Sequence, residues 1–231
     1  MPEPRQRWRL VLARDADAPT LAQRDSAALW VEAMESTDLP LHRAAAGGRP
    51  KVAFGAPLTA GMAAEAELLD LVLTERWPTW RVRAALGGRL PPGWRLVDLY
   101  DVWLAGPPLA GRVAAADYRI ELEGTADDAM RGALSAAAHG LLDARRLPRE
   151  RPKGDTTVAY DLRPLLVDVS VSPDGPRTVL MARTRFHPEL GTGRPEEVAA
   201  ALGEAIGHPL SIASIVRARL VLADELAVEL H

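Results

Sequence analysis

Lys51 is one of two lysines in a chain whose other basic side chains are all arginine, the second being Lys153. It lies in the segment 49–58, R-P-K-V-A-F-G-A-P-L, a short apolar run with a proline near each end. Together with Arg49, this lysine could hold an anionic group of a ligand. Alternatively, it is the charge that keeps a strand edge from pairing with another chain.

Two further segments have the composition of an anion-binding site. In residues 191–195, G-T-G-R-P, a glycine loop leads into a predicted helix, whose free amides and Arg194 could hold a phosphate or carboxylate. The alternative is a helix start that needs flexible backbone. The second segment, residues 145–153, is a basic run that could touch a phosphate backbone without reading sequence, or simply be a solvated loop. Its basic residues are Arg145, Arg146, Arg149, Arg151 and Lys153.

Several function classes are excluded by composition. The chain has no cysteine, which rules out disulfides, thiolate metal sites, iron–sulfur clusters and a cysteine nucleophile. Its five histidines show no metal-ligand spacing, and no G-K-S/T follows the glycine loop, so we expect neither metal nor cofactor. The net charge of −3 lacks the basic excess usual in nucleic-acid binders, so any RNA contact would rest on a local patch.

Nothing in the sequence predicts a membrane protein. No apolar run approaches the roughly 20 residues that span a bilayer, and the N-terminus, M-P-E-P-R-Q-R-W, lacks the apolar core of a signal peptide. We therefore expect a cytoplasmic location. The sequence does not fix an oligomeric state.

The first half of the chain has the pattern β-α-β-β-α-β. Thr20 and Gln23 form a capping box for a helix that reaches residue 35, and Asp25 on that helix is either a pocket acid or a paired structural group. A second helix starts at Pro78. Strands are predicted at residues 7–13, 39–43, 65–74 and 94–103, and residues 51–57 are a strand or an extended loop.

The second half repeats this order of elements without repeating the sequence. Thr125 and Asp128 are predicted to cap its first helix, and Pro195 opens its second. Extended segments are predicted at 117–123, 156–163, 166–171, 178–184 and 212–222. We therefore predict an α+β protein with two tandem ferredoxin-like subdomains, residues 1–105 and 115–231, joined by a linker at 106–114.

The order of several short motifs resembles the radical-SAM-linked protein family, a bacterial domain of unknown function. Its pattern includes S-H-L-D at the first helix, a G-F-N-P-H-P-K loop, an E-x-E-x-x-D strand, a D-x-R-P step and a G-x-x-R-P helix start. The matching residues in the first half are Asp25, Pro50, Lys51, Phe54, Pro57, Leu58, Gly61, Glu65, Glu67 and Asp70; in the second half they are Tyr118, Asp161, Leu162, Arg163, Pro164, Gly191, Arg194 and Pro195.

Two histidines of the family pattern are missing. Gln23 stands where the first would be, and Gly47, Gly48 and Arg49 replace the family's N-P-H. Glutamine and arginine do not titrate near neutral pH, so this departure favours binding over catalysis.

The resemblance implies an accessory role beside a radical SAM partner protein. We expect a non-catalytic module that binds RNA or a protein substrate, in an RNA- or ribosome-related context. The alternatives are a metal-independent RNA endonuclease using Lys51, Tyr118 and His42, and a protein–protein scaffold. The predicted binding residues are Asp25, Arg49, Lys51, Asp161, Arg163 and Arg194.

Overall fold

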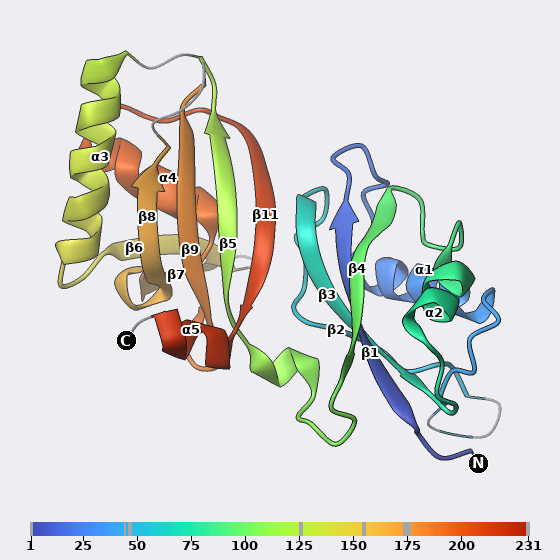
Figure 1. Cartoon of the computed structure of the whole chain (residues 1–231). Coiled ribbons are helices and arrows are strands. Elements are labelled where there is room, and N and C mark those ends of the chain that lie inside the picture. The colour runs from blue at the N-terminus through green and yellow to red at the C-terminus, as the bar shows by residue number, and fades with distance from the viewer. Residues whose placement is uncertain are drawn as a thin grey trace. The chain divides into compact units, whose positions relative to one another are not determined.

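In the computed structural model the chain divides into two compact units, Met1–Val113 and Ala114–His231 (Figure 1). The structure describes residues 2–43, 45, 48–124, 127–153, 156–172 and 177–229. Helices and antiparallel strands occur in both units, so the predicted α+β class is confirmed. The boundary between the units falls inside the predicted linker, while the independence of the two predicted subdomains stays a prediction.

Unit 1 is a sheet with two helices on one face (Figure 1). Its strands have the order β2-β3-β1-β4, and each neighbouring pair is antiparallel. The elements are β1 (Gln6–Arg14), α1 (Gln23–Glu35), β2 (Val52–Phe54), β3 (Ala63–Leu73), α2 (Thr79–Leu86), β4 (Trp94–Val102) and the short 3₁₀ helix η1 (Leu109–Arg112).

The core of unit 1 follows from the alternation of its strands. Trp8, Leu10 and Leu12 point to the helix side, and they pack against Trp30 of α1 and Val82 of α2. All five side chains are at most 3% exposed. Full burial of such side chains contributes about 1.5–3 kcal/mol each before the entropy of ordering them is subtracted.

The opposite face of the same sheet carries a buried ion cluster. Asp70 of β3 is 2% exposed and accepts hydrogen bonds from Arg7 Nε (2.8 Å) and Arg9 Nε (2.8 Å). Arg7 also donates to the carbonyls of Gly106 and Pro107, both at 3.0 Å. Asp70 is thus a structural group that compensates two buried guanidinium charges.

Unit 2 has the strand order β10-β9-β5-β11, and β8 and β10 pair with different parts of β9. Two strands, β6 and β7, form a separate hairpin. The elements are β5 (Val113–Leu122), α3 (Asp128–Asp143), β6 (Pro148–Lys153), β7 (Thr156–Asp161), η2 (Arg163–Leu165), β8 (Leu166–Val171), β9 (Val179–His187), β10 (Gly191–Thr192), α4 (Pro195–Ala205), β11 (Ile212–Leu222) and α5 (Ala223–Glu229).

The two faces of the unit 2 sheet are covered by different helices. Helices α3 and α4 lie on one face of the sheet (Figure 1), and Tyr118, Ile120 and Leu122, alternate residues of β5, are buried. The alternate residue Ala115 lies on the other side, where it packs with Val221 and with Leu226 of α5. The C-terminal helix therefore covers the face that α3 and α4 leave open.

Three local predictions are wrong. Residues 39–43 form only two isolated bridges, Leu41 with Leu73 and Arg43 with Pro50, because prolines at 40 and 50 have no N–H to donate to a ladder. The first helix starts at Gln23 with Ala22 as its N-cap and no side-chain cap bond, so Thr20 does not cap it.

The basic run was the third wrong prediction, because its second part is the strand β6 and not a loop. At the first helix of unit 2, Thr125 lies outside the described residues, and Asp127 caps the helix by accepting from the Met130 amide at 2.8 Å. No helix in the described part of the chain is both long and apolar enough to cross a membrane.

Candidate binding site

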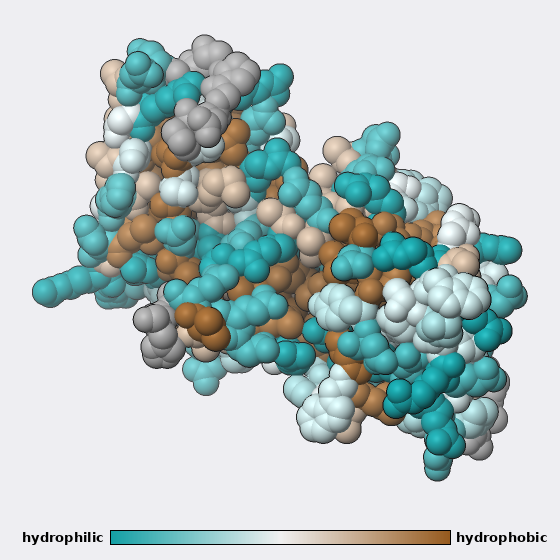
Figure 2. All heavy atoms as spheres, viewed as in Figure 1, coloured by the Kyte–Doolittle hydropathy of each residue, from teal (hydrophilic) through white to brown (hydrophobic). Residues whose placement is uncertain are grey.

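Unit 1 contains a pocket of about 330 Å³ at one end of its core. Its walls come from the start of α1, the loop that follows β2, the ends of β1 and β3, and the start of β4. A volume of this size suits a small molecule or one side chain of a larger partner. On the face drawn in Figure 2, brown apolar patches are interrupted by teal hydrophilic side chains.

Two aromatic walls of the pocket are anchored to the core. Phe54 and Trp94 line the pocket, and both meet the buried Trp30 edge to face, at ring-centroid distances of 5.8 and 5.3 Å. Phe54 is further fixed because β2 pairs it with Leu69 of β3. Such contacts contribute beyond the area that they bury, which keeps the walls in place without a ligand.

A glycine-containing turn forms the rim. The loop leaves β2 at Gly55, whose amide donates to the Leu68 carbonyl at 2.9 Å, and it returns to β3 through Gly61. Gly61 has φ +79°, a left-handed conformation that disfavours residues with a Cβ. This explains why a glycine stands between the P-L pair and β3.

Two buried polar side chains face this pocket. Arg14 is 7% exposed and donates to the carbonyls of Met62 (2.8 Å), Ala18 (3.1 Å) and Pro19 (2.9 Å), so it ties the rim to the turn after β1. Glu67 is 3% exposed and lies on the core face of β3, opposite Leu12. These two polar side chains stand in a lining whose other side chains are mostly apolar.

The lining of this pocket is mostly apolar. The described residues that line it include no histidine, lysine or tyrosine, and the polar side chains among them are Arg14, Ser26, Thr59 and Glu67. In the described part of the chain, no group of three or more His, Asp or Glu side chains could hold a metal ion. The pocket is thus an apolar cavity with a few polar side chains in its lining.

The predicted site residues of unit 1 lie outside the pocket. Asp25 is in the first turn of α1, its side chain is 59% exposed, and its nearest ion-pair partner is Arg24 at 3.8 Å. Arg49 and Lys51 are exposed just before β2. The Lys51 amide donates to the His42 carbonyl at 3.3 Å. Whether these three residues bind a ligand stays a prediction.

In unit 2, Asp161 and Arg163 form a structural corner. Asp161 accepts from the amides of Leu147 (2.7 Å) and Arg163 (3.0 Å), and the Arg163 guanidinium donates to the carbonyls of Leu142 (2.7 Å) and Leu166 (2.8 Å). Burial alone would raise the pKa of Asp161, but these backbone hydrogen bonds and Arg146 lower it below its ordinary value. The D-x-R-P step therefore connects α3 and β8.

The glycine loop before α4 has a packing role. A Cβ on Gly193 would lie 2.8 Å from the Thr184 Cβ and 2.9 Å from the Leu165 carbonyl oxygen, so the close approach requires glycine. Two acidic residues, Glu196 and Glu197, already occupy the first turn of the helix. Arg194 is exposed at the N-cap. These observations favour the helix-start interpretation over an anion site.

The basic run is partly neutralised. Arg149 pairs with Glu197 at 3.2 Å and Glu204 at 2.6 Å, which outweighs the effect of burial and raises its pKa. Arg146 lies 3.4 Å from Asp161. The side chains of residues 151–153 are outside the described part.

The pocket itself was missed as a site, although its signal was present in the sequence. Five positions that carry the family resemblance line it, and none was among the predicted site residues. They are Phe54, Pro57, Leu58, Gly61 and Glu67. No sequence motif marked Arg14, Ser26 and Trp94 as site residues, because they come from separate segments that only the folded structure brings to the pocket.

Three solved structures show distant likenesses to this chain. A chain in the crystal structure of a Cbf5-Nop10-Gar1 complex has 9% identity and a TM-score of 0.45, with 91% of this chain and 49% of that chain covered. A chain of the archaeal box H/ACA sRNP Nop10-Cbf5 complex has 12% identity and a TM-score of 0.44, with 91% and 46% covered. This chain thus spans about half the length of both.

An unknown protein from Galdieria sulphuraria has 14% identity and a TM-score of 0.25, with 91% of this chain and 98% of that chain covered. None of these likenesses carries an argument about function. The comparison with curated proteins found no match. A family model described as "Uncharacterized protein conserved in bacteria (DUF2344)" matches residues 7–199, most of the sequence, and the chain therefore belongs to this bacterial family.

Proposed function

We propose that this protein is a non-catalytic substrate-binding module whose unit 1 pocket holds an apolar group of a protein substrate. The observation that carries the proposal is that positions of the family pattern line a preformed, aromatic-walled pocket. We further propose that it acts in the cytoplasm beside a radical SAM protein, which rests on the sequence resemblance alone.

The chemistry of the pocket favours an apolar protein group over RNA. Arg14 is the one lysine or arginine among the described lining residues, and its guanidinium already donates to three backbone carbonyls instead of a phosphate. In unit 1, RNA binding is tested by substituting the exposed residues Arg49 and Lys51. For the nuclease alternative, Tyr118 is only 4% exposed within the sheet of unit 2, so no observation favours it.

We also propose that each unit is a ferredoxin-like subdomain. In unit 1 the antiparallel order β2-β3-β1-β4 supports this. In unit 2, β8-β9-β5-β11 has the equivalent order, with the β6–β7 hairpin inserted before β8 and α5 added after β11. Both units then derive from one supersecondary pattern, and the pocket is a feature of the first.

Filling the pocket tests the binding proposal. Ser26→Phe places a ring into the pocket from α1, whereas Ala28→Phe adds the same ring to an exposed position of that helix that does not line it. N-acetyl-phenylalanine amide serves as the probe, with binding followed by the indole N–H signal of Trp94 in NMR. We expect a Kd on the order of 1 mM, at least about tenfold weaker in Ser26→Phe and unchanged in Ala28→Phe.

A second experiment, with labelled single-stranded RNA, tests the competing hypothesis that the protein binds RNA. If RNA binds with a steep salt dependence, and Arg49→Ala/Lys51→Ala abolishes this binding while Ser26→Phe does not, the proposal of a protein substrate is wrong. Co-purification of the wild-type protein with a radical SAM protein, weakened by Ser26→Phe, would support the partner as well as the pocket.

A further inference from the structure

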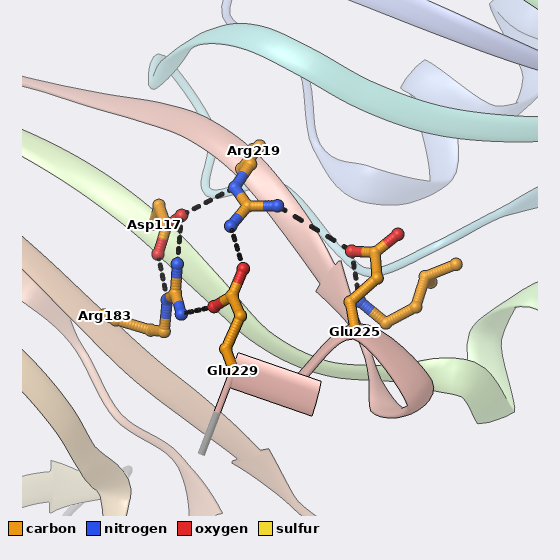
Figure 3. A network of polar contacts seen from close by, with 6 residues as sticks. Asp117, Arg183, Arg219, Glu225 and Glu229 are labelled. Carbon is orange, nitrogen blue, oxygen red and sulfur yellow. Dashed lines mark hydrogen bonds and ion pairs between the residues drawn. The ribbon is translucent and has the colours of Figure 1, made fainter. Parts of the chain in front are cut away.

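An ion-pair network ties α5 to the face of the unit 2 sheet that α3 and α4 do not cover (Figure 3). Asp117 of β5 lies at its centre. Its two oxygens accept from Arg183 Nε (2.5 Å) and Arg183 Nη2 (3.0 Å), and Arg219 Nε donates to one of them at 2.8 Å. One carboxylate therefore orients two guanidinium groups from the neighbouring strands β9 and β11.

Strand pairing places Asp117 and Arg183 side by side. Asp117 and Arg183 are directly paired residues in the β5–β9 ladder, so their side chains leave the sheet on the same face. Their side chains are only 18% and 19% exposed. Burial alone would raise the pKa of Asp117, but the bonds from Arg183 and Arg219 lower it, and the group stays ionised at neutral pH. The sheet thus supplies one carboxylate that contacts both arginines.

Glu229 of α5 occupies the outward side of this pair. One of its oxygens accepts from Arg219 Nη2 at 3.0 Å and the other from Arg183 Nη1, so a single carboxylate bridges both guanidinium groups (Figure 3). This is how a planar guanidinium pair receives a carboxylate or a phosphate from a ligand. With Glu229 absent, the two arginines would keep Asp117, while Glu225 is 3.8 Å from Arg219, and Arg183 Nη1 would lose its carboxylate partner.

The helix that carries Glu229 is short and makes few apolar contacts with the sheet. It has seven residues, too few to be stable in isolation. Its apolar contact with the sheet is made by Leu226, which is 4% exposed, whereas Val228 is 78% exposed. The Glu225 carboxylate is 3.8 Å from Arg219 and accepts from the Leu222 amide at the start of the helix. The attachment of α5 therefore depends strongly on the same arginines.

We propose that Arg183 and Arg219 form an oxyanion-binding site, and that Glu229 is an internal ligand which a carboxylate or phosphate group replaces. A cavity of about 300 Å³ adjoins the pair and gives room for the rest of such a ligand. Met181 and Asp168 also line this cavity. Because Asp168 is acidic, the ligand carries its negative charge at one end and a neutral or cationic body at the other. This site is independent of the unit 1 pocket.

The test compares full-length wild-type protein with Glu229→Gln. Glutamine keeps the size of the side chain but removes the charge that competes for the arginines. Inorganic phosphate and acetate serve as separate probes, with binding measured from the Arg183 and Arg219 Nε–H signals in NMR titrations at low salt. If α5 is attached about 90% of the time in the wild type, Glu229→Gln binds about tenfold more tightly. The probe with the larger gain identifies the oxyanion class.

Glu204→Gln is the matched control. It removes one carboxylate that pairs with an arginine of the same unit, so it changes the net charge equally, but it lies at Arg149. Affinity for either probe should stay at the wild-type value. In the double variant Glu229→Gln/Arg219→Gln, the gain should disappear.

Three results would overturn the proposal: equal affinity in Glu229→Gln and wild type, an equal gain in Glu204→Gln, or a gain that survives the loss of Arg219. Each variant is first compared with the wild type by far-UV circular dichroism. Arg219 is 40% exposed, and if its loss unfolds unit 2, Arg219→Lys replaces it in the double variant. Lysine keeps the charge but lacks the planar fork, so the gain should again fall sharply.

Discussion

Replacing Asp70 by asparagine should destabilise unit 1 by about 3 kcal/mol. The side chain keeps its shape, but Arg7 and Arg9 lose a carboxylate with contacts of 2.6–3.0 Å. Removing one partner of a buried ion pair costs about 3–5 kcal/mol because the remaining charge is uncompensated. We take the lower end of that range because Arg7 keeps its bonds to the Gly106 and Pro107 carbonyls.

Tryptophan fluorescence measures this loss selectively. All six tryptophans lie between Trp8 and Trp103, within unit 1, so the fluorescence change during urea unfolding reports that unit alone. With a urea m-value of about 2 kcal/mol/M, a loss of about 3 kcal/mol moves the midpoint down by about 1.5 M. Far-UV circular dichroism of the same samples follows both units together.

The matched control is Asp98→Asn. Asp98 lies on β4, its side chain is 63% exposed, and it pairs with Arg83 at 3.2 Å, so its loss should cost less than about 1 kcal/mol. If Asp70→Asn shifts the midpoint no more than Asp98→Asn does, the two arginines do not depend on this carboxylate, and Asp70 has no structural role.

Three further predictions concern glycines and acid. Gly193→Ala should destabilise unit 2 by about 1–3 kcal/mol, since the added Cβ meets the Thr184 Cβ at 2.8 Å. Thermal unfolding followed by circular dichroism measures this loss of stability, and an unchanged melting temperature would contradict the prediction. Gly61→Ala should cost about 1–2 kcal/mol, because φ is +79°, and should weaken the phenylalanine probe; unchanged fluorescence-detected unfolding would refute the strain. Hydrogen bonds from Arg219 and then Arg183 hold the pKa of Glu229 below its ordinary value of 4.5, so α5 should stay attached from pH 7 to 5 and detach only as the pH falls through that lowered value. Amide exchange of α5 across this range measures it, and detachment already at pH 6 would exclude the ion pairs as its anchor.

The sequence predicted those elements whose stability is encoded locally. The segment E-A-E-L-L-D-L-V-L-T fits a strand, and β3 covers most of it. The strand predicted at residues 39–43 does not form, because the prediction followed the apolar residues and overlooked that Pro40 and Pro50 have no N–H to donate. The helix α5 directly follows the long strand β11 without a glycine or proline between them, and its anchors, Arg183 and Arg219, are on other elements. No local pattern could reveal it.

The pocket shows the same limit for function. Arg14, Phe54 and Glu67 lie on three different strands, and they meet only because β2, β3 and β1 are neighbours in the sheet. Single-sequence patterns favoured conspicuous surface charges such as Lys51, whereas the buried groups that form the pocket look like ordinary core residues. The family pattern included some of them, but did not distinguish binding from structure.

The position of β4 in unit 1 has a consequence for how copies of this chain meet. Among the strands of that unit, β4 pairs only with β1, which leaves the other side of its backbone without a strand partner within unit 1. Such an edge invites a strand from another molecule. Arg95, Asp98 and Asp101 place charges of both signs along it, and the register shift opposite residues 96–98 makes it irregular. A flat apolar edge would pair with the same edge of another molecule and form larger sheets. The charges and the irregular register of β4 disfavour that pairing.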